Sequence, residues 1–160
     1  MPNLTTPQTD AGSVVANRIL DLLKAGSPNF RLPVPLANFY YGDQEQVPGD
    51  PVVCVEAGLK GREMHATQNR TLNTIQTSIF VYHARMQQIQ LTRLEADQLG
   101  EDIEQLLHAN LQLKDVNGNN PIVIHGFVQE FDPTYVFRTG TLYRTVRMTH
   151  TATTMTALAP

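Results

Sequence analysis

The stretch of sequence that decides the fold is residues 135–157, YVFRTGTLYRTVRMTHTATTMTA. Side chains of two kinds alternate along it with a period of two, which is the period of a β-strand. One face of this pattern is mostly threonine, with Thr139, Thr141, Tyr143, Thr145, Arg147, Thr149, Thr151 and Thr153. The opposite face is mostly apolar, with Leu142, Val146, Met148 and Ala152 interrupted by Arg144 and His150. The stretch therefore predicts a long strand that closes a C-terminal β-hairpin.

This predicted strand is longer than a free-standing domain needs, since strands of globular proteins usually have about 5–6 residues. Its threonine face carries little charge, whereas exposed edge strands usually carry Lys or Pro, which prevent pairing with other chains. We therefore expect part of the strand to leave the body of the protein or to meet another subunit. The alternative is a strongly bent strand that covers only the chain's own core.

The first half of the chain predicts one helix and two strands. Apolar residues recur at helical spacing after Asp10, which can act as the N-cap. Residues 51–58 form a short apolar run typical of a buried strand, and residues 71–85 alternate with a period of two. We expect the proline-rich segment 30–51 to be an extended surface loop, because proline resists both helix and central strand. The polar, glycine-containing segment 58–70 is expected to be a turn or loop.

The second half predicts one more helix and the strands of the hairpin. Residues 92–95, TRLE, have the form of a capping box, and leucine and isoleucine then recur at helical spacing up to Asn110. The apolar segment 122–131 follows as a strand, and we expect Asp132 and Pro133 to end it.

Together these elements predict an α+β fold in the order α-β-β-α-β-β. Its core is a single mixed or antiparallel sheet of about four strands, with two helices packed on one face and a long C-terminal β-hairpin. The polar residues 1–9 are expected to form a flexible N-terminal arm. Residues 10–160 are expected to form a single domain, because a length of 160 residues is typical of one core.

Composition excludes several classes of protein. The formal net charge is −3, so the chain as a whole offers no attraction to nucleic-acid phosphates or to anionic membranes. Cys54 is the only cysteine, which excludes an intramolecular disulfide. No apolar run approaches the about 20 residues of a membrane span, and the N-terminus lacks the features of a secretion signal, so we expect a reducing, cytoplasm-like compartment and no membrane.

The residues that could carry catalysis or bind a metal do not form a recognisable site. The histidines are widely separated in the sequence, at His65, His83, His108, His125 and His150. Glu130 and Asp132 share one face at strand spacing, but solvated charges at a strand end are the simpler interpretation. Residues 58–62 contain glycines and basic side chains without the pattern of a phosphate-binding loop. We therefore predict no enzyme activity, with no catalytic residue, metal or cofactor.

Two other groups of residues are candidates for contact with partners. Arg138, Arg144 and Arg147 gather on the last strand region, where they could pair with acids of a neighbouring subunit. Arg144 lies on the apolar face and needs a partner if it is buried. Tyr40 and Tyr41 could anchor a partner, or could pin the proline-rich loop to its own core.

The second predicted helix has an acidic outward face. Its acids include Glu95, Asp97, Glu101 and Asp102. If this face lined a channel, it would repel passing DNA, because the phosphate backbone is negatively charged. The alternative is an ordinary solvated outer face of the helix.

Three segments are distinctive in their order along the chain: a long strand ending VYHAR at 81–85, an acidic capped helix LTRLEADQLGEDIEQLLHAN at 91–110, and a closing hairpin IVIHGFVQEF…TGTLYRTVRMTHT at 122–151. Together with the long polar loop before them, these segments resemble the tail terminator family of long-tailed bacteriophages. The likeness covers nearly the whole chain, from Ala11 to Leu158. Members of this family are structural: they form a hexameric ring that caps the tail tube at its full length and offers the surface that completed heads join.

The resemblance implies a structural virion protein at the head-proximal end of the tail, assembled in the host cytoplasm. Its expected partners are copies of itself in a ring, the tail tube protein and a head-completion or connector protein, while DNA passes without specific binding. A ring subunit needs two different lateral surfaces, and the threonine-rich ribbon and the proline-rich loop are the candidates.

Two alternatives stay open. Within a virion, the protein could be another neck or head-completion adaptor or a tail tube protein, the last of which is expected to have mostly strands and one helix. In a different class, it could be a small ligand-binding domain or enzyme, which would need a closed apolar pocket with converging polar groups.

Overall fold

The computed structural model describes residues 11–44, 46–65, 70–84, 89–114 and 122–157. Within these ranges the chain forms two α-helices, two short 3-10 helices (η) and five strands. In chain order they are α1 (Ala11–Gly26), η1 (Ser27–Asn29), η2 (Leu36–Asn38), β1 (Phe39–Tyr41), β2 (Val52–His65), β3 (Arg70–His83), α2 (Ile89–His108), β4 (His125–Arg138) and β5 (Thr141–Ala157).

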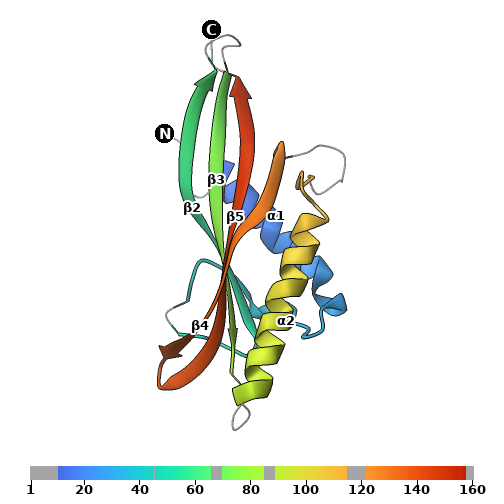
Figure 1. Cartoon of the computed structure of the whole chain (residues 1–160), viewed down its shortest axis with the longest axis vertical. Helices are drawn as coiled ribbons and strands as arrows, with labels where there is room; N and C mark the ends of the chain where they lie inside the picture. The colour runs from blue at the N-terminus through green and yellow to red at the C-terminus, as the bar shows by residue number, and fades with distance from the viewer. Residues whose placement is uncertain (1–10, 45, 66–69, 85–88, 115–121, 158–160) are drawn as a thin grey trace.

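The strands form one mixed sheet in the order β1-β2-β3-β5-β4 (Figure 1). β2, β3, β5 and β4 pair antiparallel, each with the next in that order, and β1 adds a short parallel pairing to β2. The fold is therefore α+β with a single mixed sheet and two helices, the class that the sequence predicts.

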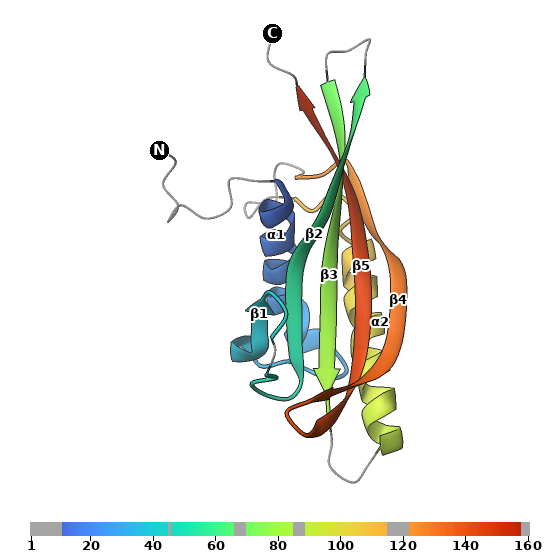
Figure 2. The same ribbon diagram turned by 90° about the vertical axis from the view of Figure 1, so that its left-hand side faces the viewer.

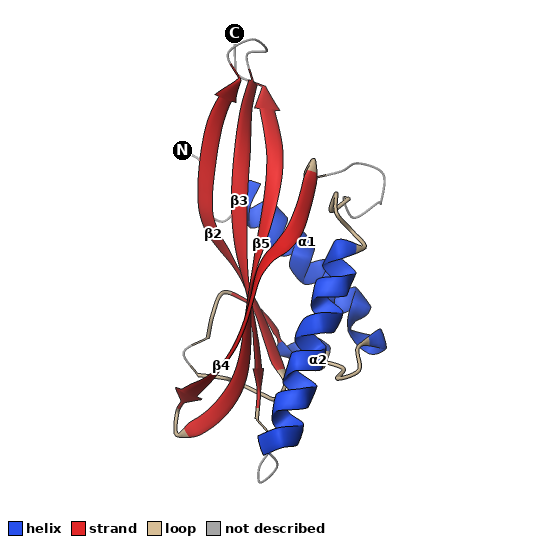
Figure 3. Cartoon of the chain, in the orientation of Figure 1, coloured by secondary structure: helices blue, strands red, loops and turns tan. Residues whose placement is uncertain are grey.

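Both helices pack on the same face of the sheet, as Figure 3 shows with helices in blue and strands in red. This face collects alternate side chains of the central strands, among them Val55, Ile79 and Met148, which are neighbours in the sheet register. Ile19 of α1 and Ile103 of α2 are fully buried in the same core. Burial of this apolar surface stabilises the fold by about 25 cal/mol per Å² removed from water.

The predicted C-terminal hairpin is present as β4 and β5. Its register ends at the pair Arg138↔Thr141, and the two residues between them, Thr139 and Gly140, have φ angles of 48° and 79°. Two central residues with positive φ make a turn whose twist matches that of the flanking strands.

The sheet has one strand more than the four expected. Residues 39–41 of the proline-rich segment form β1, so the order of elements is α-β-β-β-α-β-β. A strand this short can lie at the edge of the sheet between prolines, because an edge strand needs few backbone donors. Phe30 and Phe39 are buried, so aromatic residues pin this segment to the chain's own core, which is one of the two expected roles.

The expectation of a loop at residues 58–70 is wrong for its described part. β2 continues to His65 and β3 begins at Arg70, paired residue by residue after a bulge between Ala57 and Lys60. β4 begins at His125, which pairs with Thr153 of β5. Beyond this pair the sheet continues as a three-stranded arm of residues 62–65, 70–73 and 154–157. Figures 1 and 2 show these strand ends projecting past the helices. Because no helix covers them, these strands lack the apolar alternation that reveals a strand in sequence.

The expectation that Asp132 and Pro133 end a strand is also wrong. β4 runs through both residues to Arg138, with Pro133 opposite Val146. Proline has no N–H, but β4 lies at the edge of the sheet, where every second N–H points away from the neighbouring strand. An edge strand therefore accepts a proline that a central strand would exclude.

The long last strand differs from its expected bounds, because residues 135–138 belong to β4 and Thr139 and Gly140 form the turn, so that the strand itself is β5. Its last residues, 154–157, leave the body of the protein in the three-stranded arm, which is one of the two expected outcomes. β5 pairs with β3 of its own chain from Arg144 to Ala157, and with β4 on its other side. It is an interior strand, so another subunit is not needed to explain its length. α2 begins at Ile89 rather than at Thr92, which is buried inside the helix instead of capping it.

Candidate interaction surfaces

A cluster of charged side chains lies where the start of α2 meets the sheet, with buried cations and partly exposed carboxylates. At its centre is His83, near the end of β3, whose side chain is 5% exposed. Its Nδ1 lies 2.8 Å from Oδ1 of Asp50, and its Nε2 lies 2.9 Å from Oε2 of Glu95 in α2. The backbone N–H of Ala84 also donates to Oδ1 of Asp50, at 3.0 Å. His83 thus links the loop before β2 to the helix.

Arg144 lies beside His83, since the two are paired across β3 and β5. Its side chain is 7% exposed and donates two hydrogen bonds to the carboxylate of Asp97, at 3.1 and 3.2 Å. The guanidinium also lies 4.8 Å from the ring centroid of Tyr135 on β4. Arg144 is therefore buried and paired, as its place among apolar residues requires, but its partner belongs to the same chain.

The protonation of His83 is favoured by this environment. Burial alone would lower its pKa, but the hydrogen bonds and charges of Asp50 and Glu95 outweigh burial and raise the pKa above 6.5. Both carboxylates favour the charged imidazolium, because each accepts a charge-assisted hydrogen bond from it.

The four acids predicted to form a charged helix face all have cationic neighbours. Glu95 contacts His83 and Asp97 contacts Arg144, as described above. Glu101 and Asp102 contact the guanidinium of Arg31, at 3.2 and 2.9 Å. The face is therefore less negative than the sequence suggests, and its role as the lining of a channel stays a prediction.

The loop that follows β1 packs against the face of the sheet that the helices do not cover. The hydroxyl of Tyr82 donates a 2.5 Å hydrogen bond to Asp43, which also lies 3.4 Å from the guanidinium of Arg138. Tyr40 packs against the small apolar cluster beneath this loop, whereas Tyr41 is 45% exposed. Of the two predicted contact tyrosines, Tyr41 is the more exposed to solvent.

The same small cluster contains Cys54, which is fully buried. Burial raises the pKa of its thiol to about 11. The thiol is therefore protonated and unreactive at neutral pH.

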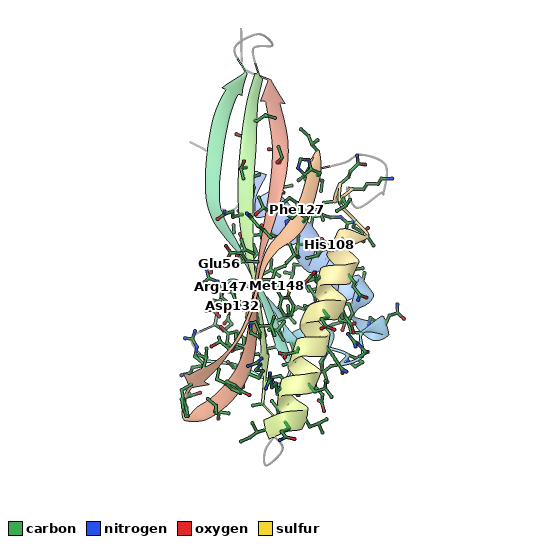
Figure 4. The ribbon with its side chains drawn as sticks, viewed as in Figure 1. Glu56, His108, Phe127, Asp132, Arg147 and Met148 are labelled. Atoms are coloured by element: carbon green, nitrogen blue, oxygen red, sulfur yellow. The ribbon has the colours of Figure 1, made fainter. Side chains whose placement is uncertain are left out.

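The rest of this sheet face is open to solvent. Arg147 lies there between Asp132 of β4 and Phe80 of β3, its partners in the register, with its guanidinium 5.8 Å from the Phe80 ring centroid. Figure 4 shows Arg147, Asp132 and Glu56 together on the side of the sheet away from α2. Thr149 and Thr151 continue the same face along β5. The structure thus separates the three candidate arginines: Arg138 and Arg147 lie on this face, and Arg144 lies on the helix face.

On the helix face, one histidine is buried in the core without a partner. His150 of β5 is fully buried, and its cross-strand neighbour Thr77 is fully buried as well. Neither ring nitrogen of His150, nor the Thr77 hydroxyl, has a hydrogen-bond partner among the described residues. Burial, assisted by the nearby His108, lowers the pKa of His150 to about 4. His150 is therefore neutral at physiological pH.

Large apolar side chains are exposed at the end of the molecule where α2 starts and the β4–β5 hairpin turns (Figures 1 and 2). Phe137 is 71% exposed and Ile89 is 66% exposed. Others at this end are Leu91, Leu94, Tyr135 and Leu142. Exposed apolar surface of this kind is typical of contact with another protein.

Two open depressions lie among the described residues, one along residues 108–114 and another between η1 and α2 near Phe30 and Asp102. No group of three or more potential metal ligands occurs among the described residues. None of the described helices combines the length and apolar character needed to cross a membrane.

No protein-family model matches this sequence, and no curated protein is significantly similar to it.

The sequence revealed some of these residues and not others. Arg144 could be identified, because a cation on an apolar strand face must find a partner. Asp43 and Asp50 could not, since both lie in a loop whose path over the sheet has no signal in sequence. For the same reason, the sequence shows His83 only as one of several widely separated histidines and does not indicate its two carboxylate partners.

Proposed function

We propose that the chain is a structural virion protein, a bacteriophage tail terminator that forms a ring on the head-proximal end of the tail tube. The observation that carries this proposal is a sheet with two unpaired edges on opposite sides. β1 covers β2 only as far as Val55, so the described residues leave Glu56–His65 of β2 with a neighbour on one side only. β4 has β5 on one side and no described strand on the other.

The directions of these two edges suit a ring. β2, β3, β5 and β4 alternate in direction, so β2 and β4 run opposite ways. If copies are related by rotation about an axis along the strands, β4 of one copy meets β2 of the next in antiparallel pairing. Such a contact joins two different surfaces, and it closes into a ring when the rotation angle allows.

The composition of β4 also favours contact with a partner. Natural edge strands avoid pairing by means of lysine, proline or short length. β4 is 14 residues long and contains Pro133 but no lysine. Phe127, Tyr135 and Phe137 along it are each at least 40% exposed. The threonine-rich strand β5 is itself interior, so its hairpin partner β4 supplies one edge in place of the lateral surface expected from the sequence. β2, which lies beside the proline-rich loop, supplies the other edge.

Further support comes from the arrangement of layers. A tail tube protein is expected to have one helix, whereas two helices cover one face of this sheet. We therefore favour the terminator over the tube protein, with the tube on one side of the ring and a head-completion or connector protein on the other. DNA would pass through the ring without specific binding.

Electron microscopy of particles assembled without this protein tests the proposal. We expect tails of uncontrolled length, or finished tails that do not join heads, and complementation with the wild-type chain should restore joined particles. Normal joined virions in its absence would contradict the proposal.

Another neck or head-completion adaptor remains the alternative within a virion. Immunogold labelling separates the two roles: label on isolated headless tails supports a terminator, and label on isolated tailless heads supports an adaptor. The ligand-binding or enzyme alternative has less support, because the two depressions described above are open rather than closed pockets.

A further inference from the structure

We propose that Asp50, His83 and Glu95 form a protonation-dependent clamp that fastens the first turns of α2 and the loop before β2 to the sheet. The clamp is independent of the ring, so that either proposal can fail without the other.

The first argument is geometric. Both ring nitrogens of His83 lie within hydrogen-bond distance of a carboxylate oxygen, at 2.8 Å for Asp50 and 2.9 Å for Glu95. A carboxylate only accepts hydrogen bonds, and a neutral imidazole carries a proton on only one nitrogen. Both contacts are therefore hydrogen bonds only when the ring is the doubly protonated imidazolium. Loss of one proton turns one of them into a repulsive contact between a lone pair and a carboxylate.

The second argument is the charge balance around the ring. Asp50 from the loop and Glu95 from α2 contact the ring directly, and Arg144 is its cross-strand neighbour on β5. Arg144 in turn contacts Asp97 of α2 and the ring of Tyr135 on β4. With His83 charged, two cations face three carboxylates. With His83 neutral, Arg144 alone faces all three. Deprotonation therefore adds repulsion between α2 and the loop around a ring that is 5% exposed, although the Asp50 side chain is itself 38% exposed and partly screened by water.

The third argument is the way in which α2 is attached. Its second half is held by Leu99, Ile103 and Leu107, all fully buried. Its first half buries only the small side chains of Thr92 and Ala96. Polar contacts through Glu95 and Asp97 thus make up a large part of what holds the first turns. Release of the clamp should loosen these turns and leave the rest of the helix in place.

The direction of the pH effect follows from the geometry, and the raised pKa of His83 agrees with it. A group whose pKa is higher in the folded state stabilises that state fully below its unfolded pKa. This stabilisation is lost as the pH rises through the folded pKa. The clamp is therefore closed below the ordinary histidine pKa of 6.5 and opens as the pH rises through the higher pKa of His83 in the folded chain.

Nuclear magnetic resonance of the full chain, with hydrogen exchange of backbone amides, tests the clamp. The ¹⁵N shifts of the His83 ring give its protonation state and its titration midpoint. Below that midpoint we expect both ring nitrogens to be protonated. Above it, exchange protection of amides 92–97 should fall about tenfold, the effect of losing one charge-assisted hydrogen bond, while amides 103–108 keep theirs.

Matched variants separate the clamp from general charge effects. Glu95→Gln keeps the hydrogen-bonding shape but removes the charge, so it should lower the His83 midpoint and weaken the step in protection. Glu104→Gln removes the same charge from the second half of α2 and should behave like the wild type. The proposal is overturned if one ring nitrogen is unprotonated below the midpoint, or if His83 titrates with no change in protection of the first turns. It is also overturned if the two variants have the same effect.

Discussion

Arg144 and His150 lie on the same face of β5 and are both buried, but Arg144 is buried as a charged group and His150 as a neutral one. Arg144 is an obligatory charge, and Asp97 neutralises it with two hydrogen bonds. His150 can lose its charge, and it is buried as a neutral ring with no hydrogen-bond partner among the described residues. On this face of β5, one buried cation is thus paired with a carboxylate, and one buried imidazole is kept neutral.

The Arg144 pair predicts a loss of stability upon truncation. Arg144→Ala leaves Asp97 without its cation, and we expect a loss of about 2 to 3 kcal/mol in the free energy of unfolding. Arg147→Ala is the matched control, because Arg147 lies on the same strand but on the open face, and it should cost less than about 0.5 kcal/mol. Urea denaturation measures both. Equal losses in the two variants would contradict this interpretation of Arg144.

His150 predicts a dependence of stability on acid. Its folded pKa of about 4 is below the ordinary 6.5, so the unfolded chain binds the proton more tightly between these values. Stability should therefore fall as the pH decreases from 6.5 to 4, by up to about 3 kcal/mol, and change little from this cause outside that window. The His150→Leu variant should lose this decline while retaining its stability at neutral pH, as measured by urea denaturation across the range. A decline of the same size in the variant would assign the effect to other groups.

The sequence indicated the need for a partner at Arg144 but not the partner itself. Asp97 is 47 residues away in sequence, and it was grouped with the outward acids because helical spacing alone does not say which way a helix turns its charged side. His150 was noted only as an interruption of the apolar face. Whether a buried histidine finds a hydrogen bond depends on side chains of other elements, which no local pattern records.

Among the elements, α2 approaches the sheet closely at Gly100. A Cβ atom at this position would lie 2.9 Å from Cγ1 of Val146 and 3.0 Å from the ring of Phe131. The absence of a side chain there brings the helix axis near β4 and β5.

Replacement of Gly100 should therefore lower stability, whereas replacement of a glycine within a helix usually raises it. Helix propensity alone would make Gly100→Ala stabilising by about 1 kcal/mol. We expect a net loss of about 1 to 2 kcal/mol in thermal or urea unfolding instead, because the added methyl group overpacks the interface. Gln105→Ala, on the exposed side of the same helix, is the control and should change stability by less than about 0.5 kcal/mol. A stabilised Gly100→Ala variant would mean that α2 can shift away from the sheet at little cost.

Element prediction succeeded where one face of an element is buried. α1 and β3 follow their sequence patterns because burial imposes a period on their side chains. The outer part of β2 was missed, since neither face of the three-stranded arm is covered by a helix. β1 was missed because three residues are too few to show a period, and the extension of β4 was missed because proline is excluded only from central strands.

For the whole molecule, the ring proposal makes a prediction about the outer edge of β4. In this strand the nitrogen of Pro133 points away from β5, and Phe137 lies an even number of residues further on, so its N–H also points outward. Phe137→Pro removes that outward donor without removing a hydrogen bond of the sheet. Phe137→Ala removes the same exposed ring but keeps the donor.

We expect Phe137→Pro to reduce ring formation on purified tail tubes far more than Phe137→Ala, with both variants folded like the wild type. Electron microscopy of capped tubes measures ring formation, and circular dichroism measures whether the variants are folded. Equal capping by the two variants would show that the outer edge of β4 does not pair with a neighbouring copy.

The position of β5 in the sheet has a consequence for how the molecule is made. β5 lies between β3 and β4, yet it follows both of them in the sequence. While the ribosome is still adding residues before Thr141, β3 lacks its second neighbour and β4 has none. Until β5 has emerged, the nascent chain therefore exposes one open edge of β3 and all of β4, so the last stage of synthesis is the one most prone to aggregation.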